Sequence, residues 1–392
     1  MGYSEEVQGK ILHDRFNKNI MTTLARCTWV PCPVIIGAGP SGLAIAACLK
    51  EKGIPSLILE KTNCIASMWK LKTYDRLRLH LPKQLCELPF MPFPAYFPTY
   101  PTKNQFMAYL ESYKNRFGLD PVFNKTVVSA EFDDRCGCWR IKAVGLKQEE
   151  TEYVSQWLIV ATGENADEVV PQIEGMMILA WRSLWISATL MPAHPSSLGT
   201  RRWTIYSSLA QLRWNLFACA TIVGARPSSR NARQINFWFV HVVAQMVPIP
   251  NLALLSSRAD AARHRFWMLG LAKIKNGDIK VFPGIKRITQ RAVEFVDGRK
   301  EDFDAIILAT GYKSNVPQWL KGGDLFSEED GMPREAFPRG WKGERGLYAV
   351  GFTKRGLLGT SLDAKLIAQD IELQWKPETP SLLPYYIQPL TL

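Results

Sequence analysis

The stretch "VIIGAGPSGLAIAACLKEKGIPSLILE", from Val34 to Glu60, decides the fold. A short apolar run ends at Ile36, and glycines follow it at GxGxxG spacing. The pattern predicts a helix over about residues 41–52 and a second strand over 56–60. A strand, a glycine loop and a helix in this order form the nucleotide-binding unit of doubly wound α/β proteins.

Each residue of this motif has a physical role. We expect Gly37 to permit the tight turn, Gly39 to let backbone approach a pyrophosphate, and Gly42 to allow close packing of helix on strand. The free N–H groups at the helix N-terminus favour an anion. Glu60 ends the second strand, where a carboxylate can accept hydrogen bonds from ribose hydroxyls. The alternative is a glycine-rich turn that binds no ligand.

Two further apolar strands end in the same tripeptide. "WLIVATG" (157–163) and "AIILATG" (305–311) each finish in Ala-Thr-Gly. The repeated ending is typical of flavoproteins with two dinucleotide-binding domains, one for FAD and one for a nicotinamide. We therefore predict an α/β flavoprotein in which these strands carry the chain between the two domains.

Composition excludes several other classes. The chain has 392 residues, 47% of them hydrophobic, and a net charge of +12. Most of the excess charge lies in residues 176–272, which hold ten arginines and a single acid, Asp260. The rest of the chain is nearly balanced, so no general basic surface and no nucleic-acid partner are expected.

The cysteines and apolar runs predict neither a metal site nor a membrane span. Cys136 and Cys138 are too close for the usual metal pair, so reduced thiols are expected. The most apolar late run (235–255) carries a histidine, a glutamine and two prolines, which is unsuitable for a spanning helix. We expect a cytoplasmic protein, with the endoplasmic reticulum surface as the alternative.

Four long segments resemble the plant YUCCA flavin monooxygenases. They are "CIASMWKLKTYDRLRLHLPKQLCELPFMPFPAYFPTYPTKNQFMAYLESY" (64–113), "GDIKVFPGIKRI" (277–288), "DAIILATGYKSNVPQWL" (304–320) and "GLYAVGFTKRGLLGTSLDAKLIAQDIE" (346–372). The resemblance covers roughly residues 30–175 and 271–376.

The resemblance implies FAD, NADPH and dioxygen as reactants and the oxidative decarboxylation of indole-3-pyruvate to the auxin indole-3-acetic acid. It assigns FAD binding to Gly37, Gly39, Gly42 and Glu60, and it places Trp69 beside the flavin pocket. A buried structural tryptophan is the alternative for Trp69. No catalytic residue is assigned.

The chain departs from the family between the two Ala-Thr-Gly strands. The family carries there a second GxGxxG loop for NADPH and, before it, the pattern FxGxxxHxxx(Y/F). Residues 176–272 contain neither, and they hold six of the chain's thirteen tryptophans. We therefore expect NADPH to bind weakly or not at all.

Back-translation offers a reason for this departure. Codons for "AWRSLWIS" (180–187), read one base earlier, can give Met-Glu-Val, a small residue, then Leu-Asp-Leu, which is an acidic amphipathic helix. "FWMLG" (266–270), shifted the same way, can give Val-Leu-Asp-Val-Gly. The hypothesis is that residues 177–270 are translated out of frame, and we expect low order there. The alternative is a genuine Arg/Trp-rich insert that binds membrane or nucleic acid.

The predicted architecture is a doubly wound FAD domain plus a disrupted NADPH domain. Residues 277–303 alternate and contain an Asp-Gly turn at 297–298, which predicts a β-meander. The helix after 360 should pack Leu362, Leu366, Ile367 and Ile371 on the FAD domain. The predicted segments are an N-terminal extension (1–29), the FAD domain (30–175 and 305–376), an abnormal segment (176–272), a remnant of the NADPH domain (273–304) and a loose tail (377–392).

Three functions remain open from the sequence. The first is the auxin-forming monooxygenase that the resemblance implies. The second is a catalytically impaired FAD-binding remnant without an NADPH site. The third is another flavoprotein with two dinucleotide domains, such as a disulfide reductase. That third function would need paired cysteines near the first helix, and Cys64 has no partner at CxxxxC spacing.

Overall fold

A computed structural model describes most of the chain outside its two ends and its middle. The described residues are 26–73, 75–79, 81–176, 184–186, 221–227, 235–240, 281–290, 292–302, 305–309, 312–323 and 325–375. The expectations for the tail (377–392), for most of the N-terminal extension and for most of the abnormal segment lie outside these residues.

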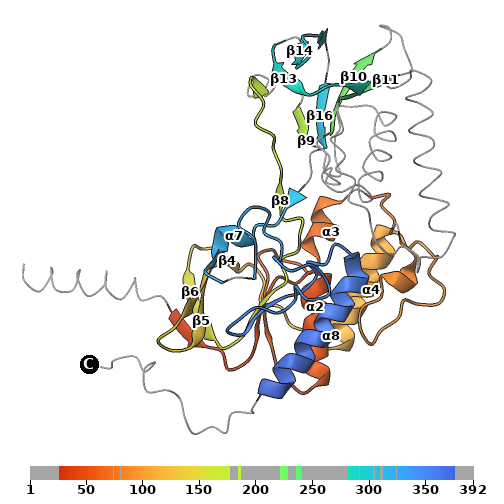
Figure 1. Ribbon diagram of the computed structural model, residues 1–392. Helices are drawn as coiled ribbons and strands as arrows, with labels where there is room; N and C mark the ends of the chain where they lie inside the picture. Colours follow the sequence, from red (N-terminus) through yellow and green to blue (C-terminus); the bar gives the residue numbers. More distant parts are fainter. Residues whose placement is uncertain are drawn as a thin grey trace, which may run out of the picture.

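A four-stranded parallel sheet forms the centre of the larger part (Figure 1). Its strand order is β19-β7-β2-β3, and every neighbouring pair is parallel. Parallel sheets are covered on both faces, which explains why their strands are continuous apolar runs. The strands are β2 (Val34–Ile36), β3 (Leu57–Leu59), β7 (Leu158–Val160) and β19 (Leu347–Ala349).

Alternate side chains of β2 enter two different hydrophobic clusters. Ile35 packs with the helices, whereas Val34 and Ile36 pack with the second sheet of this part. All three are buried. The period-2 alternation of a strand therefore divides one apolar tripeptide between two cores.

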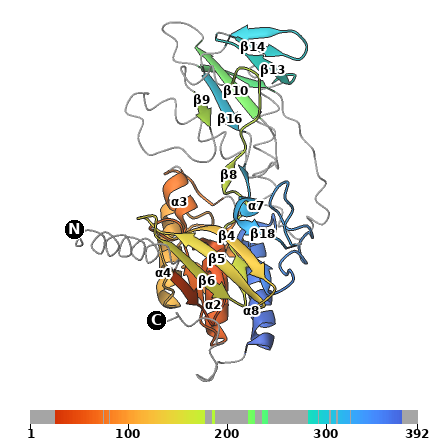
Figure 2. The same cartoon turned by 90° about the vertical axis from the view of Figure 1, so that its left-hand side faces the viewer.

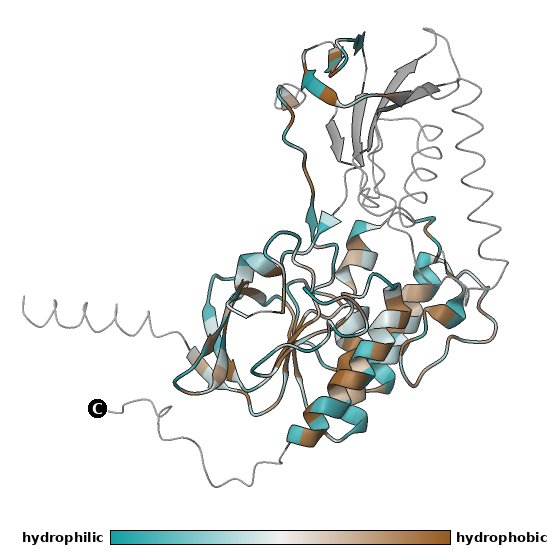
Figure 3. Ribbon diagram, viewed as in Figure 1, coloured by the Kyte–Doolittle hydropathy of each residue, from teal (hydrophilic) through white to brown (hydrophobic). Residues whose placement is uncertain are grey.

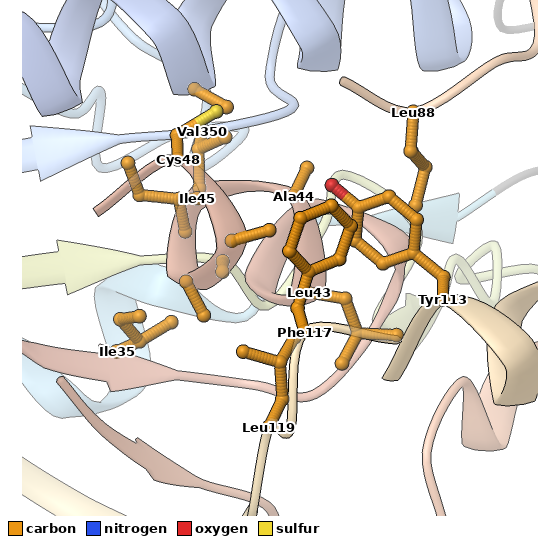
Figure 4. Packing of buried hydrophobic residues seen from close by; sticks show 14 of the residues in the cluster. Ile35, Leu43, Ala44, Ile45, Cys48, Leu88, Tyr113, Phe117, Leu119 and Val350 are labelled. Carbon is orange, nitrogen blue, oxygen red and sulfur yellow. The ribbon is translucent and has the colours of Figure 1, made fainter. Parts of the chain in front are cut away.

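Three helices cover one face of the parallel sheet. Figure 4 shows the packing around α2, where Leu43 lies by the aromatic rings of Tyr113 and Phe117 and Ile45 lies on the side of Cys48. A capping box between Thr102 and Gln105 fixes the start of α4. The helices are α2 (Pro40–Glu51), α4 (Lys103–Arg116) and α8 (Gly356–Gln374).

A second, mixed sheet covers the opposite face, as Figure 2 shows. Its order is β1-β6-β5-β4-β18, with an antiparallel meander of β4, β5 and β6 at its centre. The larger part thus has three layers. The strands are β1 (Arg26–Trp29), β4 (Thr126–Asp133), β5 (Cys138–Val144), β6 (Glu150–Ser155) and β18 (Leu320–Lys321).

Short elements complete the larger part and lead out of it. A two-stranded antiparallel ladder pairs β8, where the chain leaves the larger part, with β17, where the chain returns to it. These elements are α3 (Ser67–Lys72), η1 (Lys83–Leu85), β8 (Asp167–Glu168), β17 (Tyr312–Lys313) and α7 (Val316–Trp319).

The remaining strands gather in a smaller part beyond this ladder (Figure 1). One sheet has the order β12-β11-β10-β16-β9, and the other is the meander β13-β14-β15. The strands are β9 (Leu184–Ile186), β10 (Thr221–Pro227), β11 (Ile235–Val240), β12 (Val281–Phe282), β13 (Ile285–Ile288), β14 (Ala292–Phe295), β15 (Lys300–Asp302) and β16 (Ala305–Ala309).

Several predicted elements are confirmed. The first strand, the helix after the glycine loop and the second strand match β2, α2 and β3. The meander with its Asp-Gly turn is also present, and Gly298 has a φ of +85° in that turn. β16, which falls by residue number in the predicted C-terminal part of the FAD domain, hydrogen-bonds within the smaller part.

The prediction for the buried face of α8 is wrong for two leucines. Ile367 and Ile371 are fully buried, but Leu362 is 44% exposed and Leu366 is 36% exposed. The reason is geometric, because residues five apart on a helix differ by about 140° around its axis. Figure 3 shows hydrophobic segments on the visible surface of this helix.

Within the described residues, no helix is both long and apolar enough to cross a bilayer. The seven cysteines in that part of the chain are unpaired.

Candidate dinucleotide site

The carboxyl ends of β2, β7 and β19 meet at one edge of the parallel sheet, where open α/β sheets bind ligands. The glycine loop leaves β2 at this edge. Gly37 has a φ of +110°, and its N–H donates to the carbonyl oxygen of Leu59 at 2.8 Å. A Cβ at Gly37 would lie 2.8 Å from the carbonyl oxygen of Ala161, the residue after β7. Both the conformation and the close approach therefore require glycine.

Gly39 and Gly42 differ in their surroundings. A Cβ at Gly42 would overlap the carbonyl oxygen of Gly37, so this glycine brings α2 close to the loop. Gly39 is the N-cap of α2 and has an extended conformation that any residue can adopt. No atom lies within 4 Å of a Cβ built on Gly39. The fold does not need glycine there, and the open space fits a ligand that approaches the backbone.

Glu60 lies at the end of β3 and is 5% exposed. Its Oε2 accepts from the Ala38 N–H at 2.8 Å, and its Oε1 accepts from the N–H and hydroxyl of Thr62 at 3.0 and 2.7 Å. The Ser67 hydroxyl is 3.4 Å from the same Oε1. Since a carboxylate oxygen can accept about two hydrogen bonds, Oε2 has capacity for one ribose hydroxyl. Glu60 also ties β3 to the glycine loop.

The first Ala-Thr-Gly tripeptide continues β7 along the same edge. The Oγ1 atom of Thr162 is buried without a hydrogen-bond partner. Gly163 has a φ of +81°, and no atom lies within 4 Å of its added Cβ. An orphaned hydroxyl at Thr162 and a second glycine, Gly163, with open space around it both fit a bound group at this edge. Thr310 and Gly311 of the second tripeptide lie outside the described residues.

Trp69 lies on α3, next to the glycine loop. The segment reaches the loop through the Ala66 N–H, which donates to the carbonyl oxygen of Ala38 at 2.9 Å. The Trp69 ring is half-buried and meets Phe106 of α4 edge-on, with ring centroids 4.7 Å apart. Trp69 therefore packs against the core. Its partial exposure is compatible with a contact to the flavin, which stays a proposal.

Buried polar groups hold α3 in place. The Thr73 hydroxyl donates to the carbonyl oxygen of Trp69 at 2.5 Å. Lys103 is buried, and its Nζ donates to the carbonyl oxygen of Thr73 at 2.7 Å. A lysine at the C-terminus of a helix also complements the helix dipole. Local sequence patterns do not predict this role of Lys103, because the contact joins segments thirty residues apart.

Two carboxyl groups near the edge have shifted pKa values. Burial raises the pKa of Asp363 on α8 to about 7, opposed by a hydrogen bond from the Gly351 N–H. Burial also raises the pKa of half-buried Glu164 to about 7, opposed by the charge of Lys354. The sequence could have indicated that Asp363 is buried, since residues four apart share a helix face and Ile367 was predicted to be buried. Within the described residues, no cluster of histidine, cysteine or carboxylate groups could hold a metal ion.

The fold and this edge define the class: an α/β flavoprotein with a dinucleotide-binding parallel sheet. Residues 34–183 match the family described as "Pyridine nucleotide-disulphide oxidoreductase". Among solved structures, a bacillithiol disulfide reductase from Staphylococcus aureus gives a TM-score of 0.61 at 17% identity, covering 89% of this chain and 100% of that chain. A flavin-containing monooxygenase from Stenotrophomonas maltophilia gives 0.61 at 18%, covering 88% and 99%.

Relatives with higher identity define the family within this class. The chain is 46% identical over 413 residues to indole-3-pyruvate monooxygenase YUCCA6 of Arabidopsis thaliana, covering 96% of this chain and 98% of the relative. It is 40% identical to indole-3-pyruvate monooxygenase YUCCA1 of Oryza sativa subsp. japonica, covering 90% and 94%. The chain belongs to the YUCCA family of flavin-dependent monooxygenases, an oxidoreductase family that uses FAD and NADPH.

Proposed function

We propose that the protein is a FAD- and NADPH-dependent monooxygenase that converts indole-3-pyruvate and dioxygen to indole-3-acetic acid. The open space at Gly39, at the N-terminus of α2, is the observation on which the cofactor site depends. The substrate is the one named for the relatives from Arabidopsis and rice. We further propose a cytoplasmic location and no nucleic-acid partner.

The chain's own residues would act by binding and orienting the cofactor. The first turn of α2 presents free N–H groups to the pyrophosphate, and Gly39 leaves room for it. Oε2 of Glu60 would accept a hydrogen bond from a ribose hydroxyl, while the hydrogen bond that it accepts from the Ala38 N–H holds the glycine loop. Trp69 on α3 would border the flavin. When bound, FAD supplies the hydride-accepting and oxygen-activating chemistry.

A second candidate is an impaired flavoprotein that binds FAD but not NADPH. It is favoured by the sequence between Gly163 and Ile306, which contains no second GxGxxG loop. Hydride transfer needs the nicotinamide ring held against the flavin, and a phosphate-binding turn normally supplies that hold. We propose that residues 177–270 are read out of frame, and sequencing the transcript across them is the direct test.

Anaerobic reduction of the purified protein distinguishes the two candidates. Dithionite should bleach the bound flavin in either case, because chemical reduction needs no nicotinamide site. Rapid bleaching by NADPH, followed in air by formation of indole-3-acetate from indole-3-pyruvate, supports the monooxygenase. Bleaching by dithionite alone, with no indole-3-acetate formed, supports the impaired flavoprotein.

A further inference from the structure

The end of β19 forms part of the same sheet edge as the glycine loop. The ladder between β19 and β7 continues past Ala349, because the Val350 N–H donates to the carbonyl oxygen of Val160 at 3.0 Å. Gly351 follows with a φ of +84°. Val350 and Cys48 of α2 belong to one hydrophobic cluster, in which Figure 4 labels both. The turn at Gly351 therefore leaves the sheet next to α2.

Gly351 packs against the first turn of α2. A Cβ at Gly351 would overlap the hydroxyl oxygen of Ser41, the second residue of that helix, and would lie 3.1 Å from Oγ1 of Thr360 on α8. The Ser41 and Thr360 hydroxyl oxygens are 3.3 Å apart. The backbone at Gly351 thus lies between the N-terminal turns of α2 and α8, so its position limits where α2 can begin.

Asp363 holds this turn from the side of α8. Its side chain is 3% exposed, and its Oδ2 accepts from the Gly351 N–H at 3.1 Å. A buried carboxyl group costs desolvation energy, and burial raises its pKa to about 7. The N–H of Gly351 is thereby directed to Asp363 on α8. An apolar side chain at residue 363 would avoid this cost but could not accept the hydrogen bond from Gly351.

We propose that Asp363 is a positioning residue of the flavin site, which holds the Gly351 turn against Ser41 and so fixes the first turn of α2 for the FAD pyrophosphate. This inference rests on the proposed function, because it requires the dinucleotide to bind at α2. The role depends on a hydrogen-bond acceptor at residue 363 and not on a negative charge. An asparagine can therefore replace the aspartate.

The test measures FAD binding to flavin-free full-length protein by quenching of flavin fluorescence. We compare wild type with Asp363→Asn and Asp363→Ala and record the thermal midpoint of each. Asp370→Ala is the matched control. Asp370 lies on the same helix about two turns further on, and it accepts from the Tyr348 hydroxyl of β19 at 2.7 Å and from Lys342 at 2.6 Å.

We expect Asp363→Ala to raise the Kd for FAD about tenfold, since loss of one buried hydrogen bond has this size. Asp363→Asn should stay within about threefold of wild type on the same scale. Asp370→Ala should lower the thermal midpoint and leave the Kd unchanged. An Asp363→Ala protein with wild-type affinity would overturn the inference, as would a folded Asp363→Asn protein that has lost FAD. A wild-type protein that binds no FAD would instead contradict the proposed function.

Discussion

Glu60 and Ala38 are joined by a hydrogen bond of 2.8 Å, in which the Ala38 N–H of the glycine loop donates to the carboxylate at the end of β3. The bond connects two neighbouring strand ends of the parallel sheet. One residue thus combines a proposed contact with ribose and a structural link within the loop. The two roles make Glu60 a sensitive position for both stability and flavin binding.

Replacement of Glu60 by glutamine should weaken both properties. The amide NH₂ group would face a donor, either the Ala38 N–H or the Thr62 hydroxyl, and an unsatisfied buried donor costs about 1–3 kcal/mol. Thermal unfolding and flavin content of the Glu60→Gln protein measure the two effects. Glu152→Gln is the control, because Glu152 is buried in the antiparallel sheet and binds Arg140 there. That control should lose stability and keep its flavin, and a Glu60→Gln protein that behaves like it would refute the ribose contact.

Gly39→Leu should abolish retained flavin with little effect on folding. A leucine side chain would fill the space that surrounds Gly39, while the N-cap change costs about 1 kcal/mol. Gly42→Ala provides the contrast, because its added Cβ overlaps the Gly37 carbonyl oxygen and should destabilise the protein strongly. Flavin absorbance after gel filtration, together with thermal unfolding, separates the two effects. Unchanged flavin content in the Gly39→Leu protein would refute the pyrophosphate assignment.

Truncation of two adjacent residues on α8 should destabilise the protein to very different extents. Ile367 is fully buried, so Ile367→Ala should lower the free energy of unfolding by about 2–5 kcal/mol. Leu366 is 36% exposed, so Leu366→Ala should cost less than about 1 kcal/mol. Chemical denaturation of the two variants measures the difference. Equal losses would contradict the observed orientation of the helix.

Asp363 should make stability fall as pH rises. Its pKa is about 7 in the folded protein against 3.8 for the free group, so the unfolded chain loses this proton at lower pH. The stabilisation is complete below pH 3.8 and is lost as pH rises through 7, by about 4 kcal/mol if the whole shift is realised. The hydrogen bond from the Gly351 N–H opposes the shift.

Asparagine at residue 363 does not titrate and isolates this effect. The unfolding free energy of Asp363→Asn should therefore rise relative to wild type between pH 5 and pH 8. Urea denaturation of both proteins across this range, in the same flavin-bound state, measures the difference. A difference that stays constant with pH, or that falls as pH rises, would show that Asp363 is already ionised in the folded protein.

Local patterns predicted the central part of the fold because short-range rules control it. The GxGxxG spacing identified β2, α2 and β3, and the Asp297–Gly298 turn identified the meander. Long-range contacts were not predictable in this way. The Gly351–Asp363 bond depends on how β19 and α8 pack on α2, and the Lys103–Thr73 bond depends on the approach of α3 to α4. Two leucines of α8 were misassigned because Leu362 and Leu366 lie about 140° around the helix axis from Ile367 and Ile371, respectively, which are buried.

The flavin content of the purified full-length protein tests the central claim most directly. The sheet edge at Gly37, Gly39 and Glu60 is proposed to hold one FAD for each chain. We predict a yellow protein with flavin absorbance, which releases about one equivalent of FAD per chain on denaturation, as expected for a single dinucleotide site. A folded, colourless protein that does not bind added FAD would contradict the account.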